Sequence, residues 1–74
     1  MKSNYLNMLK FRKDAKTHFN DSDMIKFIVF GIRTSNGDYK IMNPLKYFTV
    51  RSGLESYVNE MSNIGSKVYF IERR

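Results

Sequence analysis

Residues 24–42 of this 74-residue chain read MIKFIVFGIRTSNGDYKIM. The first part, Met24–Thr34, is rich in β-branched and aromatic residues, which predicts a central β-strand. Asn36-Gly37 follows between two such runs, and this pair favours a tight type I′ hairpin turn because both central residues of that turn need positive φ. Tyr39–Met42 is the predicted returning strand. We therefore expect an antiparallel hairpin at the centre of the fold.

Helical patterns flank this hairpin on both sides. From Asn4 to Phe19 the apolar residues recur at helical spacing, which predicts a first helix. The sequence Ser52-Gly53-Leu54-Glu55 fits a capping box at the start of a second helix, and Gly65 is placed as its C-terminal cap. Residues 67–72 form a predicted last strand, whose pairing direction stays open. The sequence thus predicts an α+β fold in the order α-β-β-α-β, with two helices packed on one face of an antiparallel hairpin sheet.

Length and composition narrow the class of protein. A chain of 74 residues has room for one domain, 1–74, and 42% apolar residues argue against a disordered chain. There is no Cys, which excludes disulfides and thiolate metal sites. No stretch approaches the roughly 20 apolar residues that span a bilayer, and no signal peptide is evident, so we predict a cytoplasmic protein without a membrane partner. The abundance of residues with AT-rich codons suits a bacterium or a phage, in which case the location is the host cytoplasm.

The hairpin register predicts which side chains share a face of the sheet. With Asn36 and Gly37 as the two loop residues, Thr34 opposes Tyr39 and Arg33 opposes Lys40. The predicted core face, covered by the helices, carries Ile28, Phe30, Ile32, Tyr39 and Ile41. The predicted second face carries Phe27, Val29, Gly31, Arg33, Lys40 and Met42.

This second face is the first candidate binding surface. Like charges directly opposite each other are unfavourable in an isolated sheet, so a surface that tolerates them suits a negative partner. Aromatic side chains beside cations can stack on bases while the cations hold phosphates. The candidate residues are Phe27, Arg33, Lys40 and Met42. Alternatively, the charges are only solvated, and Phe27 and Val29 lie under another element or in a homodimer interface.

A second basic cluster lies on the predicted first helix. A basic helical face can lie along a phosphate backbone, although a solvated face is the alternative. The candidate residues here are Lys10, Arg12, Lys13 and Lys16, with His18 nearby. Arg73 at the end of the chain adds a further candidate contact.

The functional prediction is a non-enzymatic binding protein. One His, no Cys and seven carboxylates, without a glycine-rich phosphate loop or metal-ligand spacing, indicate neither catalytic residues nor a metal or cofactor. The net charge of +6 favours a phosphate-rich or acidic partner. The first hypothesis is binding of RNA or single-stranded DNA. The order of the elements also resembles several small phage proteins that inhibit a host enzyme, which implies the alternative: binding to an acidic surface of a nucleic-acid-processing or defence enzyme. A minimal nuclease using His18 as general base is a third hypothesis.

Overall fold

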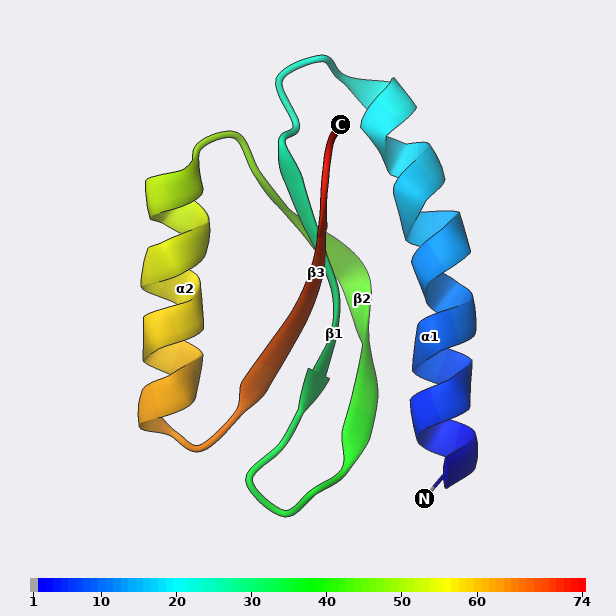
Figure 1. Cartoon of the computed structure of the whole chain (residues 1–74), viewed down its shortest axis with the longest axis vertical. Coiled ribbons are helices and arrows are strands. Elements are labelled where there is room, and N and C mark those ends of the chain that lie inside the picture. The colour runs from blue at the N-terminus through cyan, green and yellow to red at the C-terminus, as the bar shows by residue number, and fades with distance from the viewer. Residues whose placement is uncertain (1) are drawn as a thin grey trace.

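The computed structural model describes residues 2–74, with side chains described from Asn4 onward (Figure 1). Its elements are α1 (Lys2–Thr17), a single 3₁₀ turn (His18–Asp21), β1 (Phe27–Arg33), β2 (Tyr39–Phe48), α2 (Arg51–Asn63) and β3 (Lys67–Glu72). The predicted α+β class and the order α-β-β-α-β are confirmed. The first helix ends two residues before the predicted end at Phe19, because the 3₁₀ turn takes over its last residues.

The sheet has three antiparallel strands in the order β2-β1-β3. β1 is central, as predicted, and the last strand, whose direction the sequence left open, runs antiparallel to it. Five consecutive residues of β1, Phe27–Gly31, are buried. Pro44 lies in the edge strand β2, between the paired residues Ile41 and Lys46, and has no partner in β1. Because β1 is central and buried, it needs apolar residues packed against both of its faces.

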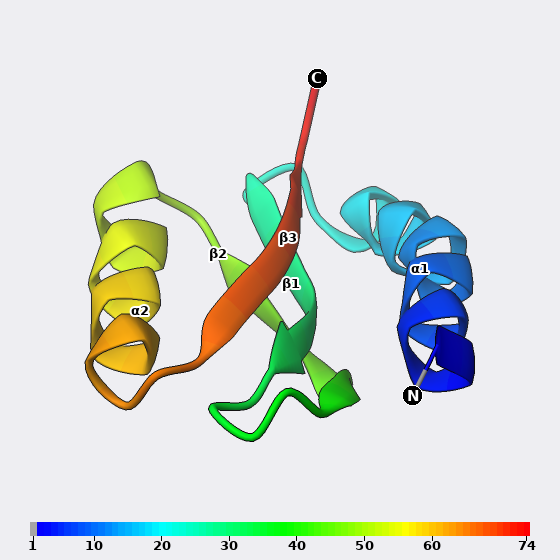
Figure 2. The same cartoon turned by 60° about the horizontal axis from the view of Figure 1, so that its bottom comes forward.

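The two helices lie on opposite faces of the sheet, so the prediction that both cover one face is wrong (Figure 2). Ile28 and Phe30 pack into one buried cluster with Met8 of α1. Phe27 and Val29 pack into a second cluster with Leu54 of α2. Alternate residues of a strand point to opposite faces, and all four of these are apolar. Each face therefore needs a helix to remove it from water.

The hairpin register differs from the prediction by one residue. Arg33 pairs with Tyr39, and Ile32 pairs with Lys40. The loop is held by hydrogen bonds from Thr34 N–H to the Asp38 carbonyl at 2.8 Å and from Gly37 N–H to the Thr34 carbonyl at 2.9 Å. Gly37 has a φ of 89°, and no other residue of this loop has a positive φ. The loop is therefore not a type I′ turn but a longer turn with a left-handed glycine.

This one-residue shift separates the two cations that were expected to face each other. Tyr39 packs against the α1-side cluster, so its partner Arg33 also lies on the α1 side of the sheet. Lys40, the next residue along β2, lies on the α2 side. The predicted Arg33–Lys40 pair is wrong: Lys40 stays on the side of Phe27 and Val29, whereas Arg33, which follows the irregularity between Val29 and Gly31, lies on the other side.

A bulge in β1 brings the backbone close to α1. The register shifts between Val29 and Gly31 on both sides of the strand. Opposite β3, Phe30 is an extra residue, whereas opposite β2 the extra residues belong to β2, between Ile41 and Lys46. A Cβ atom at Gly31 would lie 2.5 Å from Cγ of Met8, whose side chain is fully buried. Only a residue without a side chain fits at this point between strand and helix.

The ends of α2 test two local predictions. The predicted capping box is wrong, since the helix begins at Arg51, one residue before Ser52, and its N-cap Val50 provides no side-chain hydrogen bond. The C-terminal cap is confirmed: Gly65 has a φ of 81°, its N–H donates to the Ser62 carbonyl, and Ser66 N–H donates to the Met61 carbonyl at 2.8 Å.

Candidate functional site

Positive charge is concentrated on one side of the sheet. The sequence of α1 contains five Lys and Arg and one Asp, a net charge of +4. That of α2 contains one Arg and two Glu, a net charge of −1. Because these helices cover opposite faces, the α1 side is the more positive side of the sheet.

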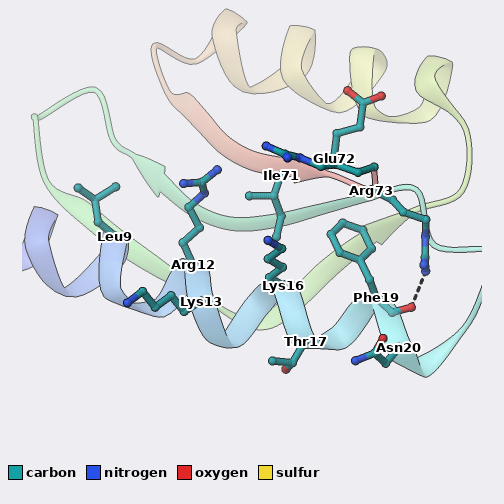
Figure 3. A pocket seen from close by; sticks show the side chains of 11 residues that line it. Leu9, Arg12, Lys13, Lys16, Thr17, Phe19, Asn20, Ile71, Glu72 and Arg73 are labelled. Carbon is teal, nitrogen blue, oxygen red and sulfur yellow. Dashed lines mark hydrogen bonds between the residues drawn. The ribbon is translucent and has the colours of Figure 1, made fainter.

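A groove of about 740 Å³ lies on this side, between α1 and the end of β3 (Figure 3). Its apolar residues are Leu9 and Phe19 from the N-terminal helical region and Ile71 from β3. The cations Arg12, Lys13, Lys16, Arg73 and Arg74 also line it. We call this site the α1–β3 groove.

Helical geometry explains how α1 supplies these cations. Met8 and Ala15 point into the core, and the positions beside them on the helix surface are Leu9, Arg12 and Lys16. Arg12 and Lys16 are four residues apart, which puts them on one flank of the helix about 6 Å apart along its axis. Figure 3 shows both side chains rising from α1 toward β3.

The groove cations lack carboxylate partners within the described part of the chain. The two ion pairs found there are His18–Asp21 and Arg51–Glu72, at 3.3 and 3.2 Å. Glu72 has the only side-chain carboxylate among the residues lining the groove, and this side chain extends toward α2, where Arg51 binds it (Figure 3). The positive charge of the groove is therefore not neutralised by the described residues.

Arg73 has a structural role that the sequence did not indicate. Its Nε donates to the Ile25 carbonyl at 2.7 Å, and its Nη2 donates to the carbonyls of Ser22, at 2.6 Å, and of Phe19. The guanidinium also lies over the Phe19 ring, 5.0 Å from its centroid. Arg73 thereby joins the end of β3 to the segment between α1 and β1 and closes one end of the groove.

Replacing Arg73 by Ala is expected to lower the free energy of unfolding by about 2 kcal/mol, because part-buried carbonyls lose a charged donor. Urea unfolding followed by circular dichroism measures this. Arg74, whose exposed side chain forms no hydrogen bond with residues 4–74, is the matched control, and Arg74→Ala is expected to change stability by less than about 0.5 kcal/mol. Equal effects of the two substitutions would show that the hydrogen bonds of Arg73 contribute nothing.

The structure brings together residues that the sequence placed in separate clusters. Four predicted binding residues, Arg12, Lys13, Lys16 and Arg73, line one groove. Lys10 is exposed on α1 but outside the groove. The helical period of α1 predicts that its cations lie on one flank. That they lie near Arg73 depends on how β3 pairs with β1.

The predicted second sheet face is not an open surface. Phe27 is only 4% exposed and packs under α2, and Met42 packs against the same buried cluster. Lys40 is exposed on that side, away from Arg33. The predicted combination of Phe27, Arg33, Lys40 and Met42 is therefore not assembled.

A cluster of tyrosines, which the sequence prediction missed, lies at the hairpin end of the α1 side. Tyr5 of α1 meets Tyr39 of β2 and Tyr69 of β3, with ring centroids 4.8 and 6.5 Å away. Arg33 lies over the Tyr39 ring at 5.9 Å, and Lys67 lies over the Tyr69 ring at 5.3 Å. The sequence shows a regular alternation in β3 and the residue after it: Lys67, Tyr69, Ile71 and Arg73. Which side chains these residues meet depends on the strand that pairs with β3.

The single His lies outside the lining of the groove. Nδ1 of His18 is 2.9 Å from the Tyr47 hydroxyl oxygen and 3.3 Å from a carboxylate oxygen of Asp21. Over the residues whose side chains are described, no three His, Asp or Glu residues cluster in a way that could hold a metal ion.

Comparisons of the chain with protein-family models, with curated proteins and with solved structures found no significant match. Within residues 2–74, no helix has the length and apolar character needed to cross a bilayer.

Proposed function

We propose that this protein binds a single strand of RNA or DNA in the α1–β3 groove. Arg12, Lys13 and Lys16 hold successive phosphates, and Arg74 contributes at the end of the chain. The observation that carries this proposal is the set of groove cations for which the described residues supply no carboxylate partner. A nucleic-acid strand carries a continuous row of phosphates, so several groove cations can each neutralise one phosphate.

The partly exposed apolar residue of the groove, Leu9, favours an unpaired strand over a duplex. Leu9 lies beside the cations of α1, where it can contact a sugar or a base face, whereas Ile71 is only 7% exposed. Unpaired bases expose those faces, whereas a duplex covers them. Phe19 is 8% exposed and has Arg73 over its ring, so it offers no stacking platform. Binding therefore relies on phosphates, and sequence preference is expected to be weak.

Salt dependence tests this proposal. Each neutralised phosphate of a single strand contributes about −0.7 to the slope of log K against log salt concentration. Four groove cations therefore predict a slope of about −2.8 or steeper, which fluorescence anisotropy with a labelled oligonucleotide of about 15 nucleotides measures. Lys46→Gln, on the α2 side, is the control and should leave the slope unchanged. A slope near zero would contradict the proposal.

The same cations would also attract an acidic protein, which is the other outcome of the test. Affinity capture from a lysate, with and without nuclease treatment, separates the two partners. Recovery of RNA or DNA supports the proposal. An acidic protein that stays bound after nuclease treatment, together with no affinity for oligonucleotides, would replace nucleic acid as the ligand of the groove.

A further inference from the structure

Two cations face each other across neighbouring strands at the hairpin end of the α1 side. Arg33 of β1 pairs with Lys67 of β3 on one flank and with Tyr39 of β2 on the other. Directly opposite like charges destabilise an antiparallel sheet. The described residues provide an ion pair to neither Arg33 nor Lys67. A bound anion would offset this repulsion.

Three phenol groups lie beside these cations and can donate hydrogen bonds to the same anion. The rings of Tyr39 and Tyr69 are 6.1 Å apart, and Tyr5 contacts both. Burial raises the pKa of Tyr69, and the neighbouring hydroxyls of Tyr39 and Tyr5 raise it further, while Arg33 lowers it. The Tyr69 hydroxyl therefore keeps its proton near neutral pH and can donate it either to the neighbouring Tyr39 hydroxyl or to a bound anion.

The arrangement of the rings favours phosphate over a nucleobase. Tyr39 has Arg33 over one face, and Tyr69 has Lys67 over one face. Tyr5 approaches both rings in edge-to-face geometry. A base needs an open ring face for stacking, whereas a phosphate oxygen needs only O–H and cationic N–H donors.

The cluster lies in line with the α1–β3 groove. Alternate residues of β3, continued by the residue after it, share one face of the sheet: Lys67, Tyr69, Ile71 and Arg73. The last two of them line the groove. From Lys67 to Arg73 the strand rises about 20 Å. On α1, Tyr5 contacts Tyr69 and Leu9 lines the groove one helical turn later.

We propose that Tyr5, Tyr39 and Tyr69, with Arg33 and Lys67, form a phosphate-binding subsite that continues the α1–β3 groove and holds the backbone of the same strand. This inference rests on the proposed function of the groove. It implies that the nucleic-acid strand is bound along most of the length of β3 and is recognised by its sugar-phosphate backbone.

The test compares two double variants with the same loss of charge. Arg33→Gln/Lys67→Gln removes two phosphate contacts, so the salt slope for a single-stranded oligonucleotide should become less steep by about 1.4. Lys40→Gln/Lys46→Gln, on the α2 side, should leave the slope unchanged. Thermal unfolding should show that the Arg33/Lys67 variant is folded, at an unchanged or higher temperature, because a like-charge pair is removed.

Pyrophosphate tests the subsite without nucleic acid. In the wild-type protein, NMR should show it shifting the ring resonances of Tyr39 and Tyr69, assigned with Tyr39→Phe and Tyr69→Phe, and not those of Tyr57 on the α2 side. If oligonucleotide binds but the slope is equal in both double variants, the subsite is wrong and the groove stands. If no oligonucleotide binds, the proposed function is wrong. The NMR shifts of Tyr39 and Tyr69 with pyrophosphate then decide whether the subsite binds phosphate.

Discussion

Replacing Arg12 and Lys16 together by Glu is expected to raise the Kd for a single-stranded oligonucleotide at least a hundredfold. Both side chains extend from one flank of α1 into the groove (Figure 3). Each lost charge-assisted contact costs about 1.5 kcal/mol, so two lost contacts correspond to a hundredfold change. The introduced carboxylates add repulsion of the phosphates. Fluorescence anisotropy at fixed salt concentration measures the change.

The matched control reverses the same amount of charge on the other side of the sheet. Lys40→Glu/Lys46→Glu should weaken binding far less, since charges beyond about 8 Å are screened at physiological ionic strength. All four lysine and arginine positions are exposed, so circular dichroism should show both variants folded. Equal losses of affinity in the two variants would show that only net charge matters and that the groove is not the binding site.

Replacing Gly31 by Ala is expected to lower the free energy of unfolding by about 3 kcal/mol. The new Cβ atom would lie 2.5 Å from Cγ of Met8 and 3.1 Å from the Lys40 carbonyl oxygen. Met8 is fully buried, and a backbone carbonyl of β2 cannot turn away. Overpacking of this kind typically costs about 1–3 kcal/mol, and two simultaneous contacts favour the upper end. Urea unfolding followed by circular dichroism measures the loss.

A double-variant cycle identifies Met8 as the cause. Met8→Ala alone should cost about 2–5 kcal/mol through the cavity it leaves. The Gly31→Ala/Met8→Ala variant should be more stable than the sum of the two losses implies, because the new methyl group occupies part of that cavity. Gly53→Ala, inside α2, is the control: its new Cβ atom would lie 3.2 Å from the Phe48 ring, and the helix preference of Ala offsets this contact, so the net change should stay below about 1 kcal/mol. Additive losses at Gly31 and Met8 would contradict the proposed contact.

Local signals were enough to predict the elements and their order. The helical period before residue 20, the β-branched run of β1, and Gly65 at the end of α2 each act over a few neighbouring residues. The capping box at Ser52 failed because the helix begins at Arg51, so that Val50 and not Ser52 occupies the N-cap position. The placement of the helices was misjudged because the four apolar residues 27–30 were assigned to one covered face and one open face.

The candidate site was predicted only in part, because some of its features are local in the sequence and others are long-range contacts. Arg12, Lys13 and Lys16 share a flank of α1 through helical geometry, which the sequence contains. Arg73 appeared to be a free cation at the chain end, but its guanidinium binds backbone carbonyls of residues 19, 22 and 25. No local pattern records such a contact, because its partners are about 50 positions away.

By itself, then, the sequence determined the elements, their order, the positive flank of α1 and the position of the hairpin turn. Only the tertiary structure decided which side chains meet. Asn36-Gly37 is compatible with more than one turn, and positive φ at Gly37 without positive φ at Asn36 shifts the register by one residue. In a sheet with a side-chain period of two, that single shift takes Lys40 away from Arg33, and the separate pairing of β1 with β3 places Lys67 beside Arg33.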